Sequence, residues 1–271
     1  MKKTFLFLMA LALLAGTLPE SAASSGTNKQ LNKKIQLFNG KNLDGWYIFL
    51  KGKGRNNDPN KVFTIKDGLI RISGEEFGCI TTNEEFENYH LVAEFKWGEK
   101  TFPPRVDKAR DCGILLHSTG EDGGSSGIWM YSIECQIIEG GTGDMLVVGD
   151  GTPKFSLTCP VAPEKQAGSY VFKPGGNPAT ITGGRINWYG RDPQWKDVKG
   201  FRGTGDIEHP LGKWNRVECW VKGHEITIYL NGHLVNHAID VRPQKGKIQI
   251  QSEGAEIFFR RITLIPLSNE Q

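Results

Sequence analysis

The stretch Ile133–Gly141 reads IECQIIEGG and places two carboxyl groups and one amide among apolar residues. In an extended strand, alternate side chains point to opposite faces. The first three apolar positions therefore share one face, and Glu134 and Gln136 share the other. The same count puts Glu139 opposite Glu134, at the start of a glycine-rich segment, so we interpret Glu139 as structural. The stretch predicts a strand with one buried and one polar face.

The same pattern recurs along the chain. Short runs rich in Val, Ile, Phe, Trp and Tyr alternate with polar residues and are separated by Gly, Asn, Asp and Pro, which is typical of antiparallel strands. No segment carries a long helical period. The sequence therefore predicts an all-β protein, a sandwich or a barrel. The predicted strands are 62–65, 69–72, 90–97, 113–117, 130–138, 185–189, 214–222, 225–230, 233–240, 247–251 and 256–264.

Turns and loops follow from glycine, asparagine and proline. Lys66-Asp67-Gly68 and Leu230-Asn231-Gly232-His233 predict hairpins, because Asp-Gly and Asn-Gly accept the positive φ of tight turns. Two long segments, Gly98–Arg110 and Gly140–Gly184, are predicted to be loops. Long loops on a β scaffold are where function usually lies.

The N-terminus has the pattern of a secretory signal peptide. Lys2 and Lys3 precede an apolar run, and small residues end at Ala23. We expect a signal peptide over residues 1–23, a linker over 24–34 and a single sandwich domain over 35–268. The apolar run is too short for a membrane span, and no cysteine near the cleavage point could accept a lipid. The protein is expected to be periplasmic or secreted.

Composition narrows the classes of partner. The formal net charge of +3 over 271 residues gives no electrostatic reason to expect nucleic acid or an acidic membrane surface. The five cysteines show neither CxxC pairs nor histidines at zinc spacing. Cys112 and Cys135 each lie in an apolar run, where a small buried thiol and a disulfide are both open interpretations.

Two further strands carry polar faces like that of Glu134. Period-2 counting places Asp111 and His117 together on one strand, and Gln251 and Glu253 together on another. Such a face can simply be solvated. Glu and Gln are weak strand formers, however, so their clustering favours a functional face.

Tryptophans near the long loops suggest a sugar ligand, because a flat apolar face with one polar edge suits a sugar ring. Trp129, Trp188 and Trp195 are the candidates, although each could instead pack in the core. Trp188 shares a face with Ile186 in the period-2 count, which weakens its case. Two further tryptophans, Trp214 and Trp220, are assigned to the core.

Other chemistries have little support. The sequence lacks a GxSxG elbow and an HExxH motif, and its glycine-rich pieces open no helix that could bind phosphate. No definite cofactor is indicated. Binding of a divalent cation, either calcium or a catalytic metal, is an open interpretation near Asp111, Asp144 or Asp150, because carboxylates are suitable ligands for a hard cation.

The chain resembles the domain-of-unknown-function 1080 family, also called the 3-keto-disaccharide hydrolase domain, from about Leu37 to Ile265. The blocks that carry the resemblance are Leu37–Trp46, Phe63–Gly68 with the strand through Glu94, Asp111–His117 followed by Glu134-Cys135-Gln136, Trp214-Asn215 through Leu230-Asn231-Gly232, and Gly246–Arg260. No block alone is decisive, but five in the same order are specific.

The resemblance implies a concanavalin A-like jelly-roll sandwich and a periplasmic role in glycoside use by a Bacteroides-like bacterium. It also implies hydrolysis of glycosides that carry a ketone at C3 of the sugar. This chain departs from the family pattern, because Asp111-Cys112-Gly113 with His117 replaces a block that usually reads Asn-Ser-Gly and ends near an Arg. Ser252-Glu253-Gly254 replaces Asp-His-Gly. We therefore expect a subgroup with a shifted substrate or altered chemistry.

The implied chemistry assigns roles to these residues. A ketone at C3 acidifies the C2 proton, so a base can start an elimination that an acid completes at the leaving oxygen. We predict Glu134 as base or acid, His117 as its counterpart and Glu253 as a second acid or a metal ligand. The residues predicted to bind or position a carbohydrate substrate are Asp111, Gln136, Gln251, Trp129, Trp188 and Trp195.

Two alternatives remain open from the sequence. One is a noncatalytic glycan-binding module that uses the tryptophan loops. The other is a laminarinase-like endoglycosidase, because Glu134 and Glu139 have the spacing of its Glu-x-Asp-x-x-Glu motif with Gln136 in place of the Asp. The sequence leaves the oligomeric state open.

Overall fold

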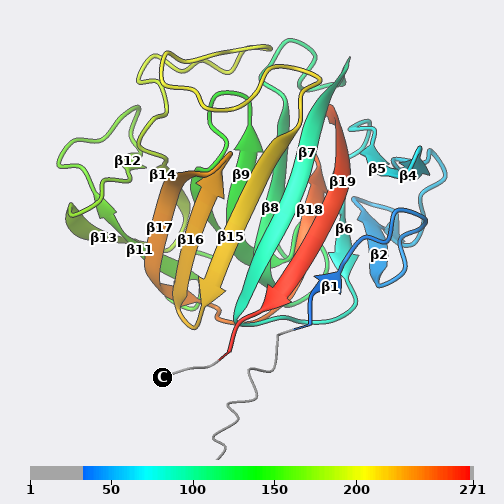
Figure 1. Cartoon of the computed structure of the whole chain (residues 1–271), viewed down its shortest axis with the longest axis horizontal. Coiled ribbons are helices and arrows are strands. Elements are labelled where there is room, and N and C mark those ends of the chain that lie inside the picture. The colour runs from blue at the N-terminus through cyan, green and yellow to red at the C-terminus, as the bar shows by residue number, and fades with distance from the viewer. Residues whose placement is uncertain (1–32, 269–271) are drawn as a thin grey trace, which may run out of the picture. The chain divides into compact units, whose positions relative to one another are not determined.

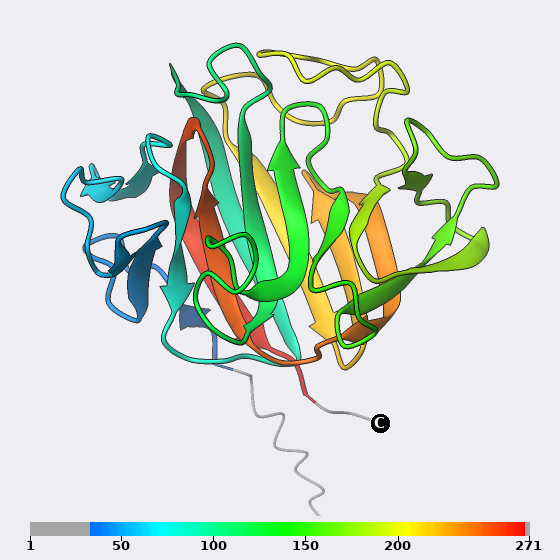
Figure 2. The same cartoon turned by 180° about the vertical axis from the view of Figure 1, so that it is seen from behind.

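The computed structural model describes residues 33–268, in which nineteen strands and no helix occur. The strands form two large sheets that pack face to face, as Figures 1 and 2 show from opposite sides. This architecture is the predicted all-β jelly-roll sandwich. The predicted signal peptide and most of the predicted linker lie outside the described residues. Within residues 33–268, the structure offers no helix with the length and apolarity needed to cross a bilayer.

One sheet has ten strands and is antiparallel throughout. Its centre is the long pair β7 and β19, which run side by side in front in Figure 1. In spatial order its strands are β13 (Asn177–Ile181), β11 (Ser156–Val161), β17 (His233–Arg242), β16 (Glu225–Leu230), β15 (Asn215–Lys222), β7 (Tyr89–Thr101), β19 (Ala255–Pro266), β5 (Leu69–Ile72) and β4 (Phe63–Lys66), with β1 (Ile35–Gln36) paired to β19.

The other sheet has nine strands and faces the viewer in Figure 2. All its neighbours are antiparallel except β12 and β14, which pair in parallel at one edge. In spatial order its strands are β12 (Tyr170–Val171), β14 (Gly184–Asn187), β10 (Met145–Val148), β9 (Tyr131–Ile138), β8 (Asp111–Thr119), β18 (Lys247–Ser252), β6 (Gly78–Thr82), β2 (Trp46–Leu50) and β3 (Gly54–Arg55).

The inner faces of both sheets share one apolar core. Ile133, Cys135 and Ile137 of β9 lie in it with Val217 and Cys219 of β15. Burying an aliphatic side chain of this size contributes about 1.5–3 kcal/mol, so the core fixes which face of each strand turns inward. The five cysteines are buried free thiols, which confirms the interpretation of Cys112 and Cys135 as small core residues.

The assignment of Trp220 to the core is wrong. On β15 the inward positions are Val217, Cys219 and Val221, so Trp220 falls on the outer face, where it is 42% exposed. Its ring stacks on that of His90 with centroids 3.8 Å apart. Trp214 is only partly buried.

Every strand predicted from the pattern is present, with ends that shift by a few residues. The two hairpin turns are confirmed, because Asp67 and Gly68 have φ of 52° and 75° and Asn231 and Gly232 have φ of 50° and 85°. Positive φ at both central residues is the geometry of a type I′ turn.

The prediction of one long loop over Gly140–Gly184 is wrong, because this segment contains β10, β11, β12 and β13. Its strands are short, and prolines interrupt their apolar pattern. Pro160 lies opposite Pro178 in the β11–β13 ribbon at the sheet edge, where a missing N–H donor is tolerated. In the other predicted loop, β7 continues to Thr101 before the chain becomes irregular.

Long connections gather over one end of the sandwich, at the top of Figures 1 and 2. The β7–β8 connection contacts the β14–β15 connection through an ion pair of 3.1 Å between Arg105 and Asp197. Glu139 joins them further, since it accepts a hydrogen bond of 2.6 Å from the Arg110 guanidinium and one of 2.9 Å from the Gly200 N–H. These contacts hold the loops against the ends of β8 and β9.

Candidate active site

The outer face of the nine-stranded sheet carries the polar side chains that alternation predicted. Because Cys112 and Ile114 of β8 and Ile248 and Ile250 of β18 pack in the core, the intervening residues face outward. On three adjacent strands these outward residues include Asp111, Gly113, Leu115, Glu134, Gln136, Gln249 and Gln251. Glu134, Gln136 and Gln251 therefore share one face, as predicted.

Gly113 is the point at which two of these side chains meet. It lies on β8, between β9 and β18, and a Cβ atom built there would overlap the Glu134 and Gln251 Oε1 atoms. The side chains of Glu134 and Gln251 thus cross the strand between them and lie over the bare backbone of Gly113. Glycine in a strand interior often marks such a close approach.

The Glu134 carboxyl lies in an environment that favours its protonated form. Its side chain is only 4% exposed, and burial raises its pKa to about 8, with a further contribution from the charge of Asp111. Arg185 and a hydrogen bond with Gln251 act in the opposite direction and limit the rise in pKa. At neutral pH this carboxyl is mostly a proton donor.

Glu253 directly follows β18, and the charge of Glu134 acts on it. Burial and, to a smaller extent, the charge of Glu134 raise the pKa of Glu253 to about 7, while Arg105 and Arg185 limit the rise. Because the charge of Glu134 disfavours ionisation of Glu253, one of the two carboxyls can hold a proton while the other acts as a base. The site therefore offers an acid and a base together near neutral pH.

Asp111 anchors the cluster. Desolvation on burial raises the pKa of Asp111, and the charge of Glu253 raises it further. The charges of Arg105 and Arg185 lower it. Both of its oxygens accept hydrogen bonds, one from the Arg105 guanidinium and one from the Gln136 amide. Because both oxygens are occupied, Asp111 orients its neighbours and is not a free acid.

Arg185 on β14 connects this cluster to a neighbouring network. Its guanidinium donates to the Gln136 Oε1 atom over 3.2 Å and to the Asp144 Oδ2 atom over 3.2 Å. Asp144 also pairs with Arg191 and accepts a hydrogen bond of 2.9 Å from the Trp188 N–H. Arg185 is thus held in place, and its charge lowers the pKa of both Glu134 and Glu253.

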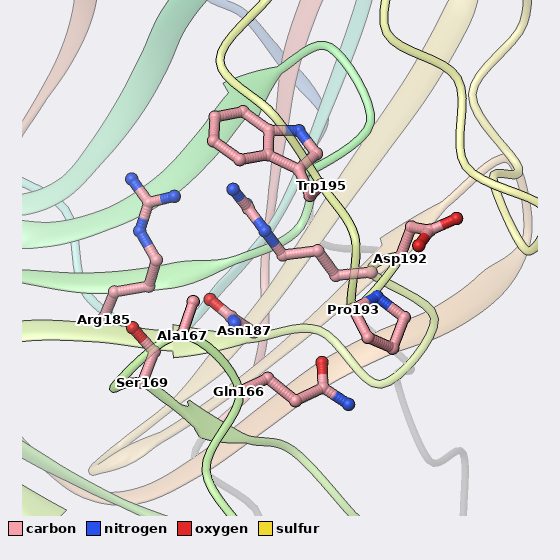
Figure 3. Close-up of a pocket in the computed structure, with 9 residues that line it drawn as sticks. Gln166, Ala167, Ser169, Arg185, Asn187, Asp192, Pro193 and Trp195 are labelled. Atoms are coloured by element: carbon pink, nitrogen blue, oxygen red, sulfur yellow. The ribbon is translucent and has the colours of Figure 1, made fainter.

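A pocket of about 240 Å³ opens beside Arg185 (Figure 3). Trp195 forms part of its wall, donates an indole hydrogen bond of 2.9 Å to the Glu139 carbonyl and stacks under the Arg191 guanidinium at 4.0 Å. The pocket is lined by Gln166, Ala167, Ser169, Arg185, Asn187, Arg191, Asp192, Pro193 and Trp195.

A family model described as a 3-keto-alpha-glucoside-1,2-lyase-like domain matches residues 33–265. The chain belongs to this family. The match spans both sheets except for the last residue of β19 and confirms the resemblance seen in the sequence. No curated protein matches the chain by sequence.

Solved structures share the fold at low sequence identity. A Parabacteroides distasonis protein, provisionally assigned as a glycosyl hydrolase, is 17% identical, covers 87% of this chain and 94% of its own, and has a TM-score of 0.51. A second such protein from the same organism is 20% identical with coverages of 87% and 100% and a TM-score of 0.49. The Bacillus subtilis carbohydrate binding module CBM66 is 11% identical with coverages of 82% and 95% and a TM-score of 0.42.

In this member of the 3-keto-alpha-glucoside-1,2-lyase-like family, His117 does not join the carboxyl cluster. The pairing of β8 with β9 shifts between Leu116 and Thr119, and His117 has a φ of 53°. This irregularity reverses the predicted alternation. The ring is fully buried against Tyr89 of the opposite sheet, and its Nδ1 lies 2.7 Å from the Pro243 carbonyl. Burial lowers the His117 pKa to about 4.

The three predicted tryptophans lie in different surroundings. Trp188 is 2% exposed and packs in the main core, so it does not face the pocket. Trp129 is 8% exposed and covers Leu115 and Cys79 on the outer sheet face, in a separate apolar cluster. Trp195 alone among them lines the pocket.

Glu139 and the proposed cation ligands have other partners. Glu139 binds Arg110 and the Gly200 N–H, so it does not pair with Glu134 as a laminarinase-like motif would require. Asp111 and Asp144 bind arginines, and Asp150 accepts hydrogen bonds from Thr152. Over residues 33–268 no group of three or more His, Cys, Asp or Glu side chains is placed to bind a metal ion.

Sequence reasoning missed the three arginines of the site and the role of Gly113. Arg185 could have been found, because Ile186 turns inward and its neighbours must turn outward. Gly113 also gave a signal, as a glycine inside a predicted strand. Arg105 and Arg191 lie in irregular segments, where no periodicity predicts which way a side chain points.

Proposed function

We propose that this protein cleaves 3-keto-glycosides by eliminating the C1 substituent together with the C2 proton, and that water then adds to the product. The observation that carries this proposal is the group of buried carboxyls around Gly113, in which Glu134, with a pKa of about 8, and Glu253, with a pKa of about 7, supply an acid and a base on one sheet face. The description of the family as 1,2-lyase-like supports the same bonds.

The first step removes the C2 proton. The C3 ketone acidifies this proton, and Glu253, with the lower pKa of the pair, accepts it. The electron pair of the C2–H bond forms an enolate with the C3 oxygen. Arg185, whose charge already lowers the pKa of both carboxyls, stabilises the negative oxygen.

The second step expels the substituent at C1. The enolate electrons form the C1–C2 double bond and restore the C3 ketone while the C1–O bond breaks. Glu134, protonated at neutral pH, donates its proton to the leaving oxygen. Gln251 holds the Glu134 carboxyl in position for this transfer. Water then adds its oxygen to C1 and a proton to C2, which gives the 3-keto sugar.

The test compares 3-keto and unoxidised versions of the same disaccharides, each incubated with the purified protein with and without a chelator. Cleavage of the oxidised set alone is expected. Glu134→Gln and Glu253→Gln should each abolish turnover while the fold is kept, and Glu164→Gln, at an exposed carboxyl, is the matched control. Cleavage of both sets, or full activity of Glu134→Gln, would contradict the mechanism.

A noncatalytic glycan-binding function is the second candidate. The pocket beside Arg185, with Trp195 in its wall, supports it, because such a pocket can bind a sugar without any chemistry. In that case Glu134→Gln would keep all glycan binding and the wild type would cleave neither set of disaccharides.

We also propose that the protein is exported, on the strength of its N-terminal sequence. Expression of the full chain in a Gram-negative host, followed by fractionation and N-terminal sequencing, is expected to yield a periplasmic or secreted chain that begins after Ala23. A cytoplasmic chain that retains Met1 would contradict export.

A further inference from the structure

Residues 200–211 of the β14–β15 connection, which we call the closing segment, lie at the loop end of the sandwich, at the top of Figure 1. The segment buries the carboxyl group of Glu208, which is 3% exposed. The Glu208 Oε1 atom accepts a hydrogen bond of 2.6 Å from the Trp97 indole on β7, and the Oε2 atom lies 2.9 Å from the Thr142 hydroxyl in the β9–β10 turn. This one side chain therefore joins the closing segment to the ends of both sheets.

The Thr142 hydroxyl indicates that Glu208 carries a proton. A hydroxyl has a single proton to donate, and it can also accept. The Thr142 Oγ1 atom lies 3.1 Å from the Ile138 carbonyl oxygen as well as 2.9 Å from the Glu208 Oε2 atom. The carbonyl can only accept, so both hydrogen bonds form together only when Thr142 donates to Ile138 and Glu208 donates to Thr142. A protonated carboxyl thus satisfies every member of this network, and an ionised one does not.

Two neighbouring carboxylates also disfavour ionisation of Glu208. Desolvation on burial, followed by the charge of Asp206 and then that of Glu139, raises the pKa of Glu208 to about 8. The hydrogen bonds with Thr142 and Trp97 limit this rise. At neutral pH the buried carboxyl is therefore mostly neutral.

The cations around this carboxyl have partners of their own. Arg110 pairs with Glu139 over 2.6 Å, and Arg202 pairs with Asp206 over 3.1 Å. The Nδ1 atom of His209 lies 2.7 Å from a backbone carbonyl oxygen. An ionised carboxylate at this position would have to take a cation away from an existing ion pair.

A cavity of about 270 Å³ lies beside the buried carboxyl. Trp97, Pro210 and Leu211 give it apolar walls, and Glu208 contributes to its lining. Leu211 is 47% exposed, so the rim of the cavity borders solvent. Hydration of an ionised carboxylate stabilises it far more than apolar walls do, so ionisation favours a displaced segment that admits water.

The closing segment also supports the wall of the pocket beside Arg185. The Gly200 N–H and the Trp195 indole both donate hydrogen bonds of 2.9 Å to Glu139. The Phe201 ring lies against that of Trp195, with centroids 6.2 Å apart. Displacement of the segment would therefore remove a neighbour of Trp195, which lines the pocket.

We propose that the closing segment is a pH-sensitive latch, held shut by the neutral Glu208 carboxyl and released when hydroxide removes its proton. Hydroxide becomes water, and the electron pair of the O–H bond stays on the carboxylate, which then faces Asp206 and Glu139. The latch controls the Trp195 wall of the pocket. It acts in the same way whichever substrate or ligand the protein takes, so its test needs no activity assay.

The test measures trypsin cleavage after Arg202 in the full-length protein from pH 7 to 9.5, because cleavage of a folded chain reports how often a segment opens. Glu208→Gln is the matched variant. Its amide can accept from Trp97 and donate to Thr142, but it does not ionise. The initial cleavage rate of wild type relative to this variant should rise about tenfold over the range, as a pKa of 4.5 in the open state and about 8 in the closed state requires. The pH dependence of trypsin and the ionisation of Glu134 are common to both proteins and cancel.

Three controls separate the latch from other causes. Glu164→Gln, which removes an exposed carboxyl, should behave like wild type. Cleavage after Arg216 in β15 reports global unfolding and should be at least about tenfold slower than cleavage after Arg202. Thr142→Val removes the acceptor of the Glu208 proton and should speed cleavage after Arg202 at pH 7 about fivefold, the value of one hydrogen bond of about 1 kcal/mol.

Any of three results would overturn the latch. The first is a ratio of wild-type to Glu208→Gln cleavage that stays constant with pH. The second is equal cleavage after Arg202 and Arg216, which would show that the segment opens only when the whole protein unfolds. The third is a Thr142→Val variant that is cut at the wild-type rate.

Discussion

Replacing Glu134 by Gln should make the folded protein more stable in alkaline solution. Burial raises the Glu134 pKa from 4.5 to about 8, so between these pH values the folded chain holds a proton that the unfolded chain releases. The free energy of unfolding therefore falls as pH rises through this window. A glutamine has no proton to lose and escapes this loss.

The pKa values give the size of the effect. The difference between 4.5 and about 8, at about 1.4 kcal/mol for each pKa unit, corresponds to about 5 kcal/mol. Wild type and Glu134→Gln should have similar stability at pH 4, and the variant should gain up to about 5 kcal/mol relative to wild type by pH 9. The shared titration with Glu253 makes this value an upper bound.

Urea unfolding followed by tryptophan fluorescence, repeated at each pH from 4 to 9, measures this difference. Glu164→Gln, which removes an exposed carboxyl, controls for the change in net charge. If the stability curves of Glu134→Gln and wild type run parallel over the whole range, Glu134 is ionised at neutral pH and its role as the proton donor is refuted.

Three further outcomes are expected. Gly113→Ala should destabilise the fold by about 1–3 kcal/mol and reduce turnover, because the added Cβ atom overlaps the side chains of Glu134 and Gln251. Thermal melts and activity assays measure the two effects. An unchanged activity would contradict the close approach of these side chains to Gly113. Glu139→Ala should cost about 3–5 kcal/mol in urea unfolding, since it leaves the buried Arg110 without its carboxylate; a loss below 1 kcal/mol would show that this ion pair is not structural. All five thiols should react with a disulfide reagent in denaturant and none in the native protein, whereas three reactive thiols in denaturant would indicate a disulfide.

The sequence predicted the fold and part of the site because both depend on alternation. Ile133, Cys135 and Ile137 must turn into the core, and this requirement alone orients Glu134 and Gln136. The same argument placed Gln251. Wherever a strand keeps its period from end to end, the buried face determines the polar one.

The prediction failed where the period breaks or where no period exists. The shift in pairing after Leu116 turns His117 toward the opposite sheet, and nothing in the local residue pattern marks it. Arg105 and Arg191 come from irregular connections, so only the folded chain shows that they neutralise Asp111 and Asp144. The core assignment of Trp220 failed because alternation on its strand turns it outward.

The site is also assembled from segments that lie far apart in the chain. Arg105 comes before β8, Glu134 lies on β9, Arg185 lies on β14 and Glu253 follows β18. Because these segments pair only after long loops have closed, the carboxyl cluster exists only in a chain whose nine-stranded sheet is complete. A partly folded or truncated chain would therefore hold none of these carboxyls at its raised pKa, and the proposed activity would report that the sheet is complete.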